Sequence, residues 1–197
     1  FIKAAVKGTM KVMDAKPVTF RLLDPPLHEF VPQTELKKNE LAEELNITVG
    51  EIEKRGESLH EVNPMMGHRG VRLHITYPMI SETQFRAIFT AAAELKNEGF
   101  DPKPEIMVPV TISDRELRFQ KAICEKIRAE VEAEFGFEIE YMFGTMIEIP
   151  RAALTADRMA RTAEFFSFGT NDLTQMTFGF PRDDVGTFMG DYLGNKI

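Results

Sequence analysis

The sequence has little cysteine, no long apolar run and a deficit of basic residues. Its single cysteine, Cys124, excludes an internal disulfide and is typical of a protein from a reducing compartment. No apolar stretch approaches the roughly 18 residues that a membrane span requires. The 24 Lys and Arg residues are outnumbered by 31 Asp and Glu residues, giving a net charge of −7, and form no cluster suited to a phosphate backbone. We therefore expect a soluble intracellular protein with neither nucleic acid nor a membrane as partner.

Sequence signatures of several ligand sites are missing as well. The four histidines, His28, His60, His68 and His74, lack the H-x-x-x-H spacing of zinc ligands. No P-loop and no G-x-G-x-x-G motif is present, which disfavours direct nucleotide binding. Cys124 lies in a helical pattern with nothing nearby to lower its pKa, so we interpret it as a packing residue rather than a nucleophile.

The composition is sufficient for a hydrophobic core. The chain has 197 residues, of which 43% are hydrophobic, and it contains neither an internal repeat nor a Gly/Ser linker. We therefore predict a single domain over residues 1–197. Because the sequence starts at Phe1 without a signal segment and stops at Ile197 without a terminal cap, we expect it to be part of a longer polypeptide.

Short apolar runs rich in Val, Ile and Phe predict buried strands, and helices are predicted between them. Because strands and helices alternate, the sheet is predicted to be parallel. Two helices, over residues 82–97 and 114–134, are each preceded by a capping-box pattern, Ser81 with Gln84 and Ser113 with Glu116. The five predicted strands are residues 18–23, 71–76, 105–110, 138–149 and 164–170.

This pattern predicts an α/β fold that is part of a TIM (β/α)₈ barrel. A complete barrel has eight strands and about 250 residues, whereas about five of the eight βα units are predicted here. Bare edges of a parallel sheet are not found in folded proteins, so other chain segments are expected to cover the open edges.

Two carboxylates stand where predicted strands end, which is where (β/α) barrels place their reactive groups. Glu148 ends an otherwise apolar run just before Pro150, and Asp172 follows the strand at residues 164–170. Two carboxylates on one rim suit Mg²⁺, which prefers oxygen ligands and keeps positions for water and substrate. The alternative is that each carboxylate caps the following helix.

Two arginines are further candidates, although neither is a specific signal by itself. Arg21 interrupts an apolar strand, and a buried arginine must be paired or bound to an anion. Its partner is either a ligand or one of the nearby carboxylates, Asp24 and Glu29. Arg69 stands between glycines in residues 67–70 (GHRG), where its fork can bind a carboxylate or phosphate, unless it is simply solvated.

Taken together, four segments resemble the PEP-utilising enzyme family, and they span nearly the whole chain. Within that family, residues 24–30 (DPPLHEF) and 169–180 (GTNDLTQMTFGF) are similar to the pyruvate, phosphate dikinases, whereas PEP synthases and Enzyme I of the sugar phosphotransferase system differ after the first arginine. The four segments are residues 21–30, 63–70, 146–154 and 165–180.

The resemblance implies a site that binds Mg²⁺ and pyruvate or phosphoenolpyruvate. It also implies a parent enzyme that interconverts ATP, phosphate and pyruvate with AMP, diphosphate and phosphoenolpyruvate, through a phosphohistidine domain and as a homodimer. The implied roles are metal ligation by Glu148 and Asp172, binding of the phosphoryl and carboxylate groups by Arg21 and Arg69, and lining of the substrate site by Gly169, Thr170 and Asn171.

Several parts of the dikinase pattern are not found in these residues. They are the Thr-Ser-His motif of the phosphohistidine domain, the ATP-grasp domain, the Gly-Glu-His-Gly-Gly segment with its acid cysteine, and an upstream strand with another arginine. Pro181, where a serine is common, is a small departure that affects no catalytic group. We therefore expect these 197 residues alone to show no dikinase activity, and turnover by the isolated chain would contradict that expectation.

Three other functions remain open. They are a PEP synthase, a magnesium-dependent pyruvate-enolate lyase, which uses a similar Glu and Asp pair without a phosphohistidine partner, and a non-catalytic binding fragment. The sequence does not distinguish cytoplasm, plastid and glycosome.

Overall fold

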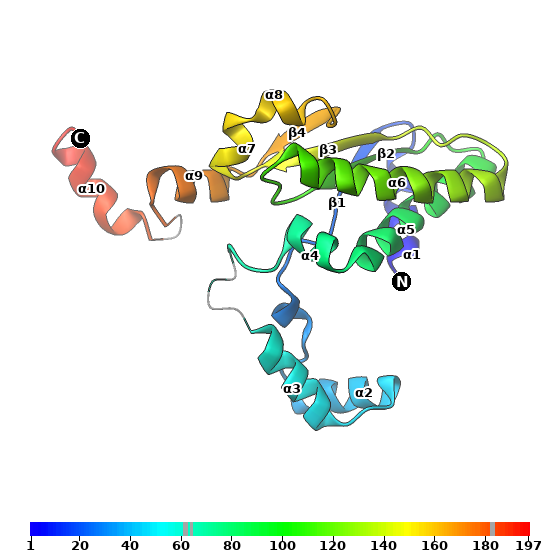
Figure 1. Ribbon diagram of the computed structural model, residues 1–197, viewed down its shortest axis with the longest axis horizontal. Coiled ribbons are helices and arrows are strands. Elements are labelled where there is room, and N and C mark those ends of the chain that lie inside the picture. Colours follow the sequence, from blue (N-terminus) through cyan, green and yellow to red (C-terminus); the bar gives the residue numbers. More distant parts are fainter. Residues whose placement is uncertain (61–62, 64, 182–183) are drawn as a thin grey trace.

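Four parallel strands form one curved sheet in the computed structural model, in the order β1-β2-β3-β4 (Figure 1). The structure describes residues 1–60, 63, 65–181 and 184–197. The parallel α/β arrangement confirms the predicted part of a (β/α)₈ barrel. The strands are β1 (Pro17–Arg21), β2 (Lys103–Val108), β3 (Met142–Ile147) and β4 (Phe165–Phe168).

Helices lie between the strands in the sequence and beside the sheet in the structure (Figure 1). None of the helices in the described ranges is long and apolar enough to cross a membrane. The helices are α1 (Ile2–Met13), the 3₁₀ turn η1 (Leu27–Phe30), α2 (Glu35–Leu45), α3 (Val49–Leu59), α4 (Gly70–Thr76), α5 (Pro78–Asn97), α6 (Asp114–Phe135), α7 (Pro150–Leu154), α8 (Ala156–Met159), α9 (Thr170–Phe178) and α10 (Gly186–Gly194).

The prediction of a strand at residues 71–76 is wrong, because these residues form α4. Burial falls on Gly70, Val71, Leu73 and His74, which is a helical spacing, and the N–H of Tyr77 donates to the carbonyl of Leu73. An apolar run of six residues is too short for its periodicity to separate a strand from a helix. The described residues therefore contain four of the five predicted strands.

The two predicted helices exist, but only one of the predicted capping boxes does. Ser113 and Glu116 cap α6 as expected. In contrast, α5 begins earlier than predicted, at Pro78, whose fixed φ suits the first helical position. Ser81 is therefore inside the helix, where its hydroxyl donates to the carbonyl of Pro78, and the side-chain oxygen of Gln84 accepts the N–H of Leu23.

The core lies between the sheet and the long helices α5 and α6, which pack on each other. Large side chains from both helices and both central strands are fully buried there, and this burial supplies most of the driving force for folding. They include Phe85, Phe89 and Leu95 of α5, Leu117 of α6, Ile106 of β2, and Phe143 and Ile147 of β3.

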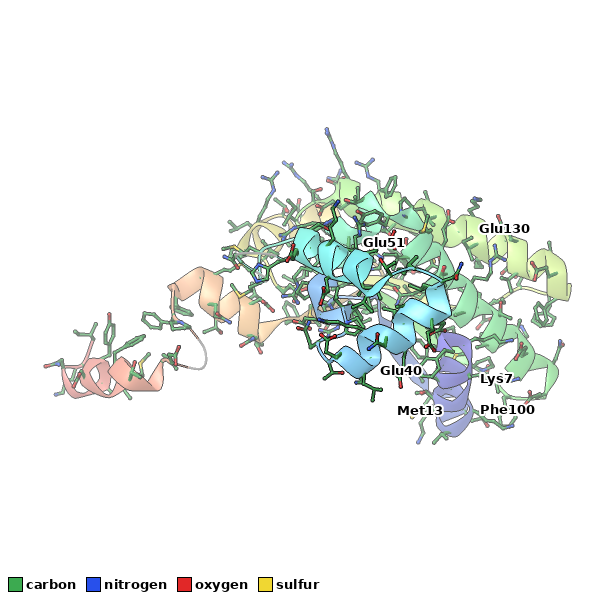
Figure 2. The ribbon with its side chains drawn as sticks, turned by 90° about the horizontal axis from the view of Figure 1, so that it is seen from below. Lys7, Met13, Glu40, Glu51, Phe100 and Glu130 are labelled. Atoms are coloured by element: carbon green, nitrogen blue, oxygen red, sulfur yellow. The ribbon has the colours of Figure 1, made fainter. Side chains whose placement is uncertain are left out.

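Helices α2 and α3 form a hairpin that projects from the body (Figure 1); Glu40 and Glu51 mark the two helices in Figure 2. Ala42 and Ile52 are the residues that the two helices bury. Because α2 is polar on most sides and shows no clear apolar periodicity, and α3 is only 11 residues long, the hairpin was not predicted from the sequence. At the other end, α10 buries no residue, and the side chains of Phe188 and Tyr192 contact Phe180 in the segment before it.

Glycine at position 144 sets the approach of β3 to β4. A Cβ there would collide with the carbonyl oxygen and ring of Phe165. We expect Gly144→Ala to lower the free energy of unfolding by about 1–3 kcal/mol, as overpacking does. Gly8→Ala, in the open interior of α1, should instead raise it by about 0.5–1 kcal/mol. Urea denaturation measures both, and equal effects would contradict the proposed crowding at Gly144.

Candidate functional site

One open pocket of about 560 Å³ lies beside the carboxyl ends of β1, β3 and β4. It gathers every residue that the sequence analysis proposed for the site, from segments up to about 150 positions apart along the chain. The pocket is also lined by Met65, Met146 and Phe168, which were not predicted from the sequence. The predicted residues at its wall are Arg21, Arg69, Glu148, Gly169, Thr170, Asn171 and Asp172.

Glu148 is the buried carboxylate of this pocket. It follows the last residue of β3, is 2% exposed, and accepts the N–H of Val110 at 2.5 Å. Burial, followed by the neighbouring carboxylates of Asp24 and Asp172, raises the pKa of Glu148 to about 7, although the Val110 N–H opposes the shift. The predicted pair Glu148 and Asp172 therefore does converge, and its two acidic groups interact directly.

Gly169 allows β3 and β4 to bring the two carboxylates together. A Cβ at this position would collide with the Cβ of Glu148 and lie 2.7 Å from its Oε2. The N–H of Gly169 donates to the carbonyl of Ile147, which continues the pairing of the two strands. Because Asp172 follows in the first turn of α9, the close approach at Gly169 also sets its position relative to Glu148.

The alternative that these carboxylates are helix caps does not hold. Helix α7 has Ile149 as its N-cap and α9 has Gly169, and neither helix has a side-chain capping bond. Asp172 still benefits from its place in the first turn of α9, where the helix dipole favours negative charge.

Asp24 organises the two arginines. Arg69 donates to both oxygens of this buried carboxylate, from Nε at 3.2 Å and from one terminal nitrogen at 2.7 Å, and Arg21 forms a more distant ion pair at 3.5 Å. The ion pair of Arg21 with Asp24, one of the alternatives left open for this arginine, is therefore present. The expectation that Arg21 is buried is wrong, because it ends β1 with 49% of its side chain exposed to the open pocket.

Asn171 presents a buried acceptor in the same pocket. In the described ranges, its Oδ1 has neither solvent contact nor a hydrogen-bond partner. Buried polar atoms are almost always paired, so an orphaned one in a pocket wall is typical of a ligand site. The predicted role of Asn171 in lining a substrate site fits this observation.

The donor set fits a magnesium ion better than zinc. Among the described residues, no group of three or more His, Cys, Asp and Glu side chains is arranged to enclose a metal. Glu148 and Asp172 offer two hard carboxylates in an open pocket, which would leave coordination positions for water and substrate oxygens, as Mg²⁺ requires. The mutual repulsion of these two groups is what a cation would relieve.

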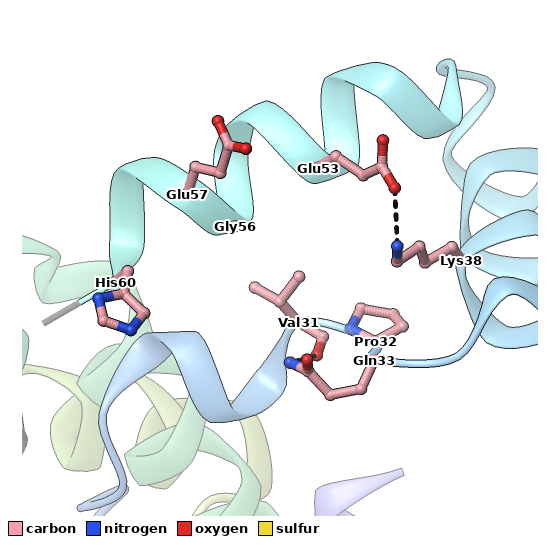
Figure 3. A pocket seen from close by; sticks show the side chains of 8 residues that line it. All are labelled: Val31, Pro32, Gln33, Lys38, Glu53, Gly56, Glu57 and His60. Atoms are coloured by element: carbon pink, nitrogen blue, oxygen red, sulfur yellow. Dashed lines mark hydrogen bonds and ion pairs between the residues drawn. The ribbon is translucent and has the colours of Figure 1, made fainter.

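A larger cavity, of about 800 Å³, lies in the projecting hairpin rather than at the strand ends (Figure 3). The ion pair between Lys38 and Glu53 spans part of it. None of the residues predicted for the site lines this cavity, so we place the candidate site at the strand ends. Its lining residues are Val31, Pro32, Gln33, Lys38, Glu53, Gly56, Glu57 and His60.

Comparison with known proteins agrees with the family resemblance of the four sequence segments. A model of the PEP-utilising enzyme family, PEP-binding domain, matches residues 2–189. Pyruvate, phosphate dikinase of Clostridium symbiosum is 53% identical over 198 residues, which cover 100% of this chain and 23% of the relative. The chloroplastic pyruvate, phosphate dikinase of Flaveria pringlei is 54% identical, over 97% of this chain and 20% of the relative. The pyruvate, phosphate dikinase of Giardia intestinalis is 53% identical, over 96% of this chain and 22% of the relative. The chain thus spans about a fifth of the length of these relatives.

The raised pKa of Glu148 predicts a stability that depends on pH. The pKa of this group in the unfolded state is near 4.5. Its contribution to the free energy of unfolding is therefore complete below pH 4.5 and is lost as the pH rises through about 7. Between pH 4.5 and pH 8, without metal, we expect the unsubstituted chain (the parent of the variants) to lose up to about 3 kcal/mol of its free energy of unfolding relative to Glu148→Gln. Glu140→Gln, at an exposed position, should follow the parent. Parallel curves for the parent and Glu148→Gln in urea denaturation would contradict this prediction.

Cys124 is a packing residue, as predicted. It lies fully buried on α6, and burial raises the pKa of its thiol to about 12. We expect less than about 1% of the labelling rate of an unfolded thiol when a disulfide reagent is added at pH 8, because the reactive thiolate is scarce and shielded. Labelling in denaturant serves as the control, and equal rates would show that Cys124 is accessible.

Proposed function

Because the chain belongs to the PEP-utilising enzyme family through its PEP-binding domain, we propose that it is the pyruvate- and phosphoenolpyruvate-binding part of a pyruvate, phosphate dikinase. The whole enzyme would interconvert ATP, phosphate and pyruvate with AMP, diphosphate and phosphoenolpyruvate. A phosphohistidine carried by another part of the polypeptide would deliver the phosphoryl group. The dikinase is preferred over a PEP synthase or a lyase because relatives that cover 96% or more of this chain are named dikinases.

The observation that carries the proposal is the convergence of Glu148, Asp172 and the two arginines on one pocket. Pyruvate must become an enolate before its oxygen can accept a phosphoryl group, so the site has to stabilise negative charge that develops during the reaction. A bound Mg²⁺ would supply Lewis-acid stabilisation of that charge. Glu148 and Asp172 would hold the ion, which also accounts for the placement of two carboxylates in contact.

The arginines would bind the phosphoryl and carboxylate groups of the substrate. Asp24 engages two nitrogens of the Arg69 guanidinium, which fixes the plane of the group and leaves its other terminal nitrogen for a ligand. Arg21 is exposed to the pocket, and among the described residues its one ion pair is the distant one with Asp24, so it is available for phosphoryl oxygens. Arginine suits both roles because it stays charged and binds oxyanions bidentately.

The residues at the start of α9 would orient the substrate. Thr170 and Asn171 line the pocket next to Gly169, and the buried Oδ1 of Asn171 calls for a donor from a ligand or an ordered water. Such fixed polar groups position pyruvate and exclude random water, which protects a reactive enolate from premature protonation.

The same proposal implies partners but no particular compartment. The phosphohistidine-bearing domain would dock over the pocket to reach the bound pyruvate, and the parent enzyme would be a homodimer. Relatives of this chain include a bacterial enzyme and chloroplastic enzymes, so cytoplasm, plastid and glycosome all remain compatible with the proposal.

Calorimetric titration of phosphoenolpyruvate, with and without Mg²⁺, tests the site. We expect magnesium-dependent binding by the parent chain, and a loss of at least about 100-fold in affinity for Glu148→Ala, since removal of groups that merely support a metal ligand already costs 10–100-fold. Glu140→Ala, an exposed carboxylate elsewhere, is the matched control.

Circular dichroism must first show that all three proteins are folded. Equal affinities of the parent and Glu148→Ala would rule out the proposed role of Glu148. No binding by the folded parent would contradict the proposal that this part of the enzyme binds phosphoenolpyruvate in the described pocket.

A further inference from the structure

The backbone beside Glu148 has an unusual conformation. Val110 has φ +61°, in the left-handed region that β-branched residues rarely adopt. Its N–H is the backbone donor to Oε1 of Glu148. Strained backbone persists only where the surroundings over-determine it, so the contacts of residues 109–111 should reveal what holds this amide in place.

On one side, the start of α4 holds the loop. The N–H of Val71 donates to the carbonyl of Pro109 at 3.0 Å. Gly70, itself at φ +54°, lies so close that a Cβ would be 2.7 Å from Cγ2 of Val110. The loop is thereby connected to the segment that carries Arg69.

On the other side, two buried threonine hydroxyls link β2 to β3. Thr145 donates to the carbonyl of Val108 at 2.6 Å, and the hydroxyls of Thr111 and Thr145 are 2.6 Å apart. Because the single proton of Thr145 is used by Val108, Thr111 must be the donor to Thr145. Both threonines are 0% exposed, so the two hydroxyls are shielded from bulk solvent. These two hydrogen bonds involve Val108 and Thr111, which lie on either side of the strained residue Val110 in the sequence.

We propose that Thr111 and Thr145 are positioning residues, whose linked hydroxyls hold the Val110 amide against Glu148 and so orient this carboxylate toward the pocket. The inference rests on the proposed function, since it gives the threonines a role in magnesium and phosphoenolpyruvate binding. Neither residue lines the pocket, so the effect reaches the ligand only through Glu148.

Thr145→Val removes the hydroxyl with little change in shape, and Thr145→Ser retains it. We expect Thr145→Val to speed amide hydrogen exchange of Val110 by about 10-fold or more, and to weaken magnesium-dependent phosphoenolpyruvate binding by about 10-fold, as loss of a supporting group does. Thr145→Ser should stay within about 2-fold of the parent in both measurements. Thr162→Val, at another buried threonine, should change neither.

Amide exchange in the ligand-free chain separates positioning from general stability. A merely structural role would speed exchange of core amides such as those of Ile106 and Phe143 together with Val110, whereas the proposal requires a change confined to the loop. If Thr145→Val does not fold, Thr111→Val takes its place, because it leaves the bond between Thr145 and Val108 intact.

Two outcomes would overturn the inference: unchanged Val110 exchange and affinity in the folded valine variant, or uniform acceleration across the core. Failure of the proposed function is distinguishable from both. If the parent binds no phosphoenolpyruvate, the proposed function fails, while the exchange measurements still decide whether the threonines hold Val110.

Discussion

The burial of the Glu148 carboxyl group beside two other acidic groups is the constraint on which the rest of the site depends. Removing a carboxylate from water is unfavourable unless it is hydrogen-bonded and paired, and Asp24 and Asp172 make its ionisation harder still. The fold compensates in part with the Val110 N–H. A bound cation would relieve the remaining repulsion, so the electrostatic cost in the free protein and the proposed binding of Mg²⁺ would have the same origin.

The surrounding fold is arranged around that group. Gly169 lets β4 approach closely enough for Asp172 to meet Glu148, and Asp24 places the guanidinium of Arg69 in a fixed plane across the pocket. Arg69 also adjoins Gly70, which packs on Val110. A continuous path of contacts therefore joins the arginine that would bind an anion to the amide that holds the carboxylate, and a shift in either should move the other.

Four of the five strands predicted from short apolar runs are present among the described residues, and the candidate residues at the strand ends line one pocket. Glu148 and Arg21 were candidates because each is a charged residue within an apolar run, whereas Arg69 was suggested only by the glycines on either side. Residues 71–76 were assigned to a strand because six residues do not define a period, whereas the contact of Val71 with Pro109 shows how tertiary structure fixes the helix. The α2–α3 hairpin escaped notice because it buries little more than Ala42 and Ile52.

The sequence by itself determined the fold class, the alternation of strands and helices, the family and the identities of the charged residues at the strand ends. Only the tertiary structure decided that Asp24 pairs with Arg69, that Arg21 is exposed and that Val110 adopts a left-handed conformation. The physical reason is that local propensity and periodicity act over a few residues. Ion pairing, burial and strand register depend on groups that are brought together from distant segments, such as Asp24 with Arg69 and Val110 with Glu148.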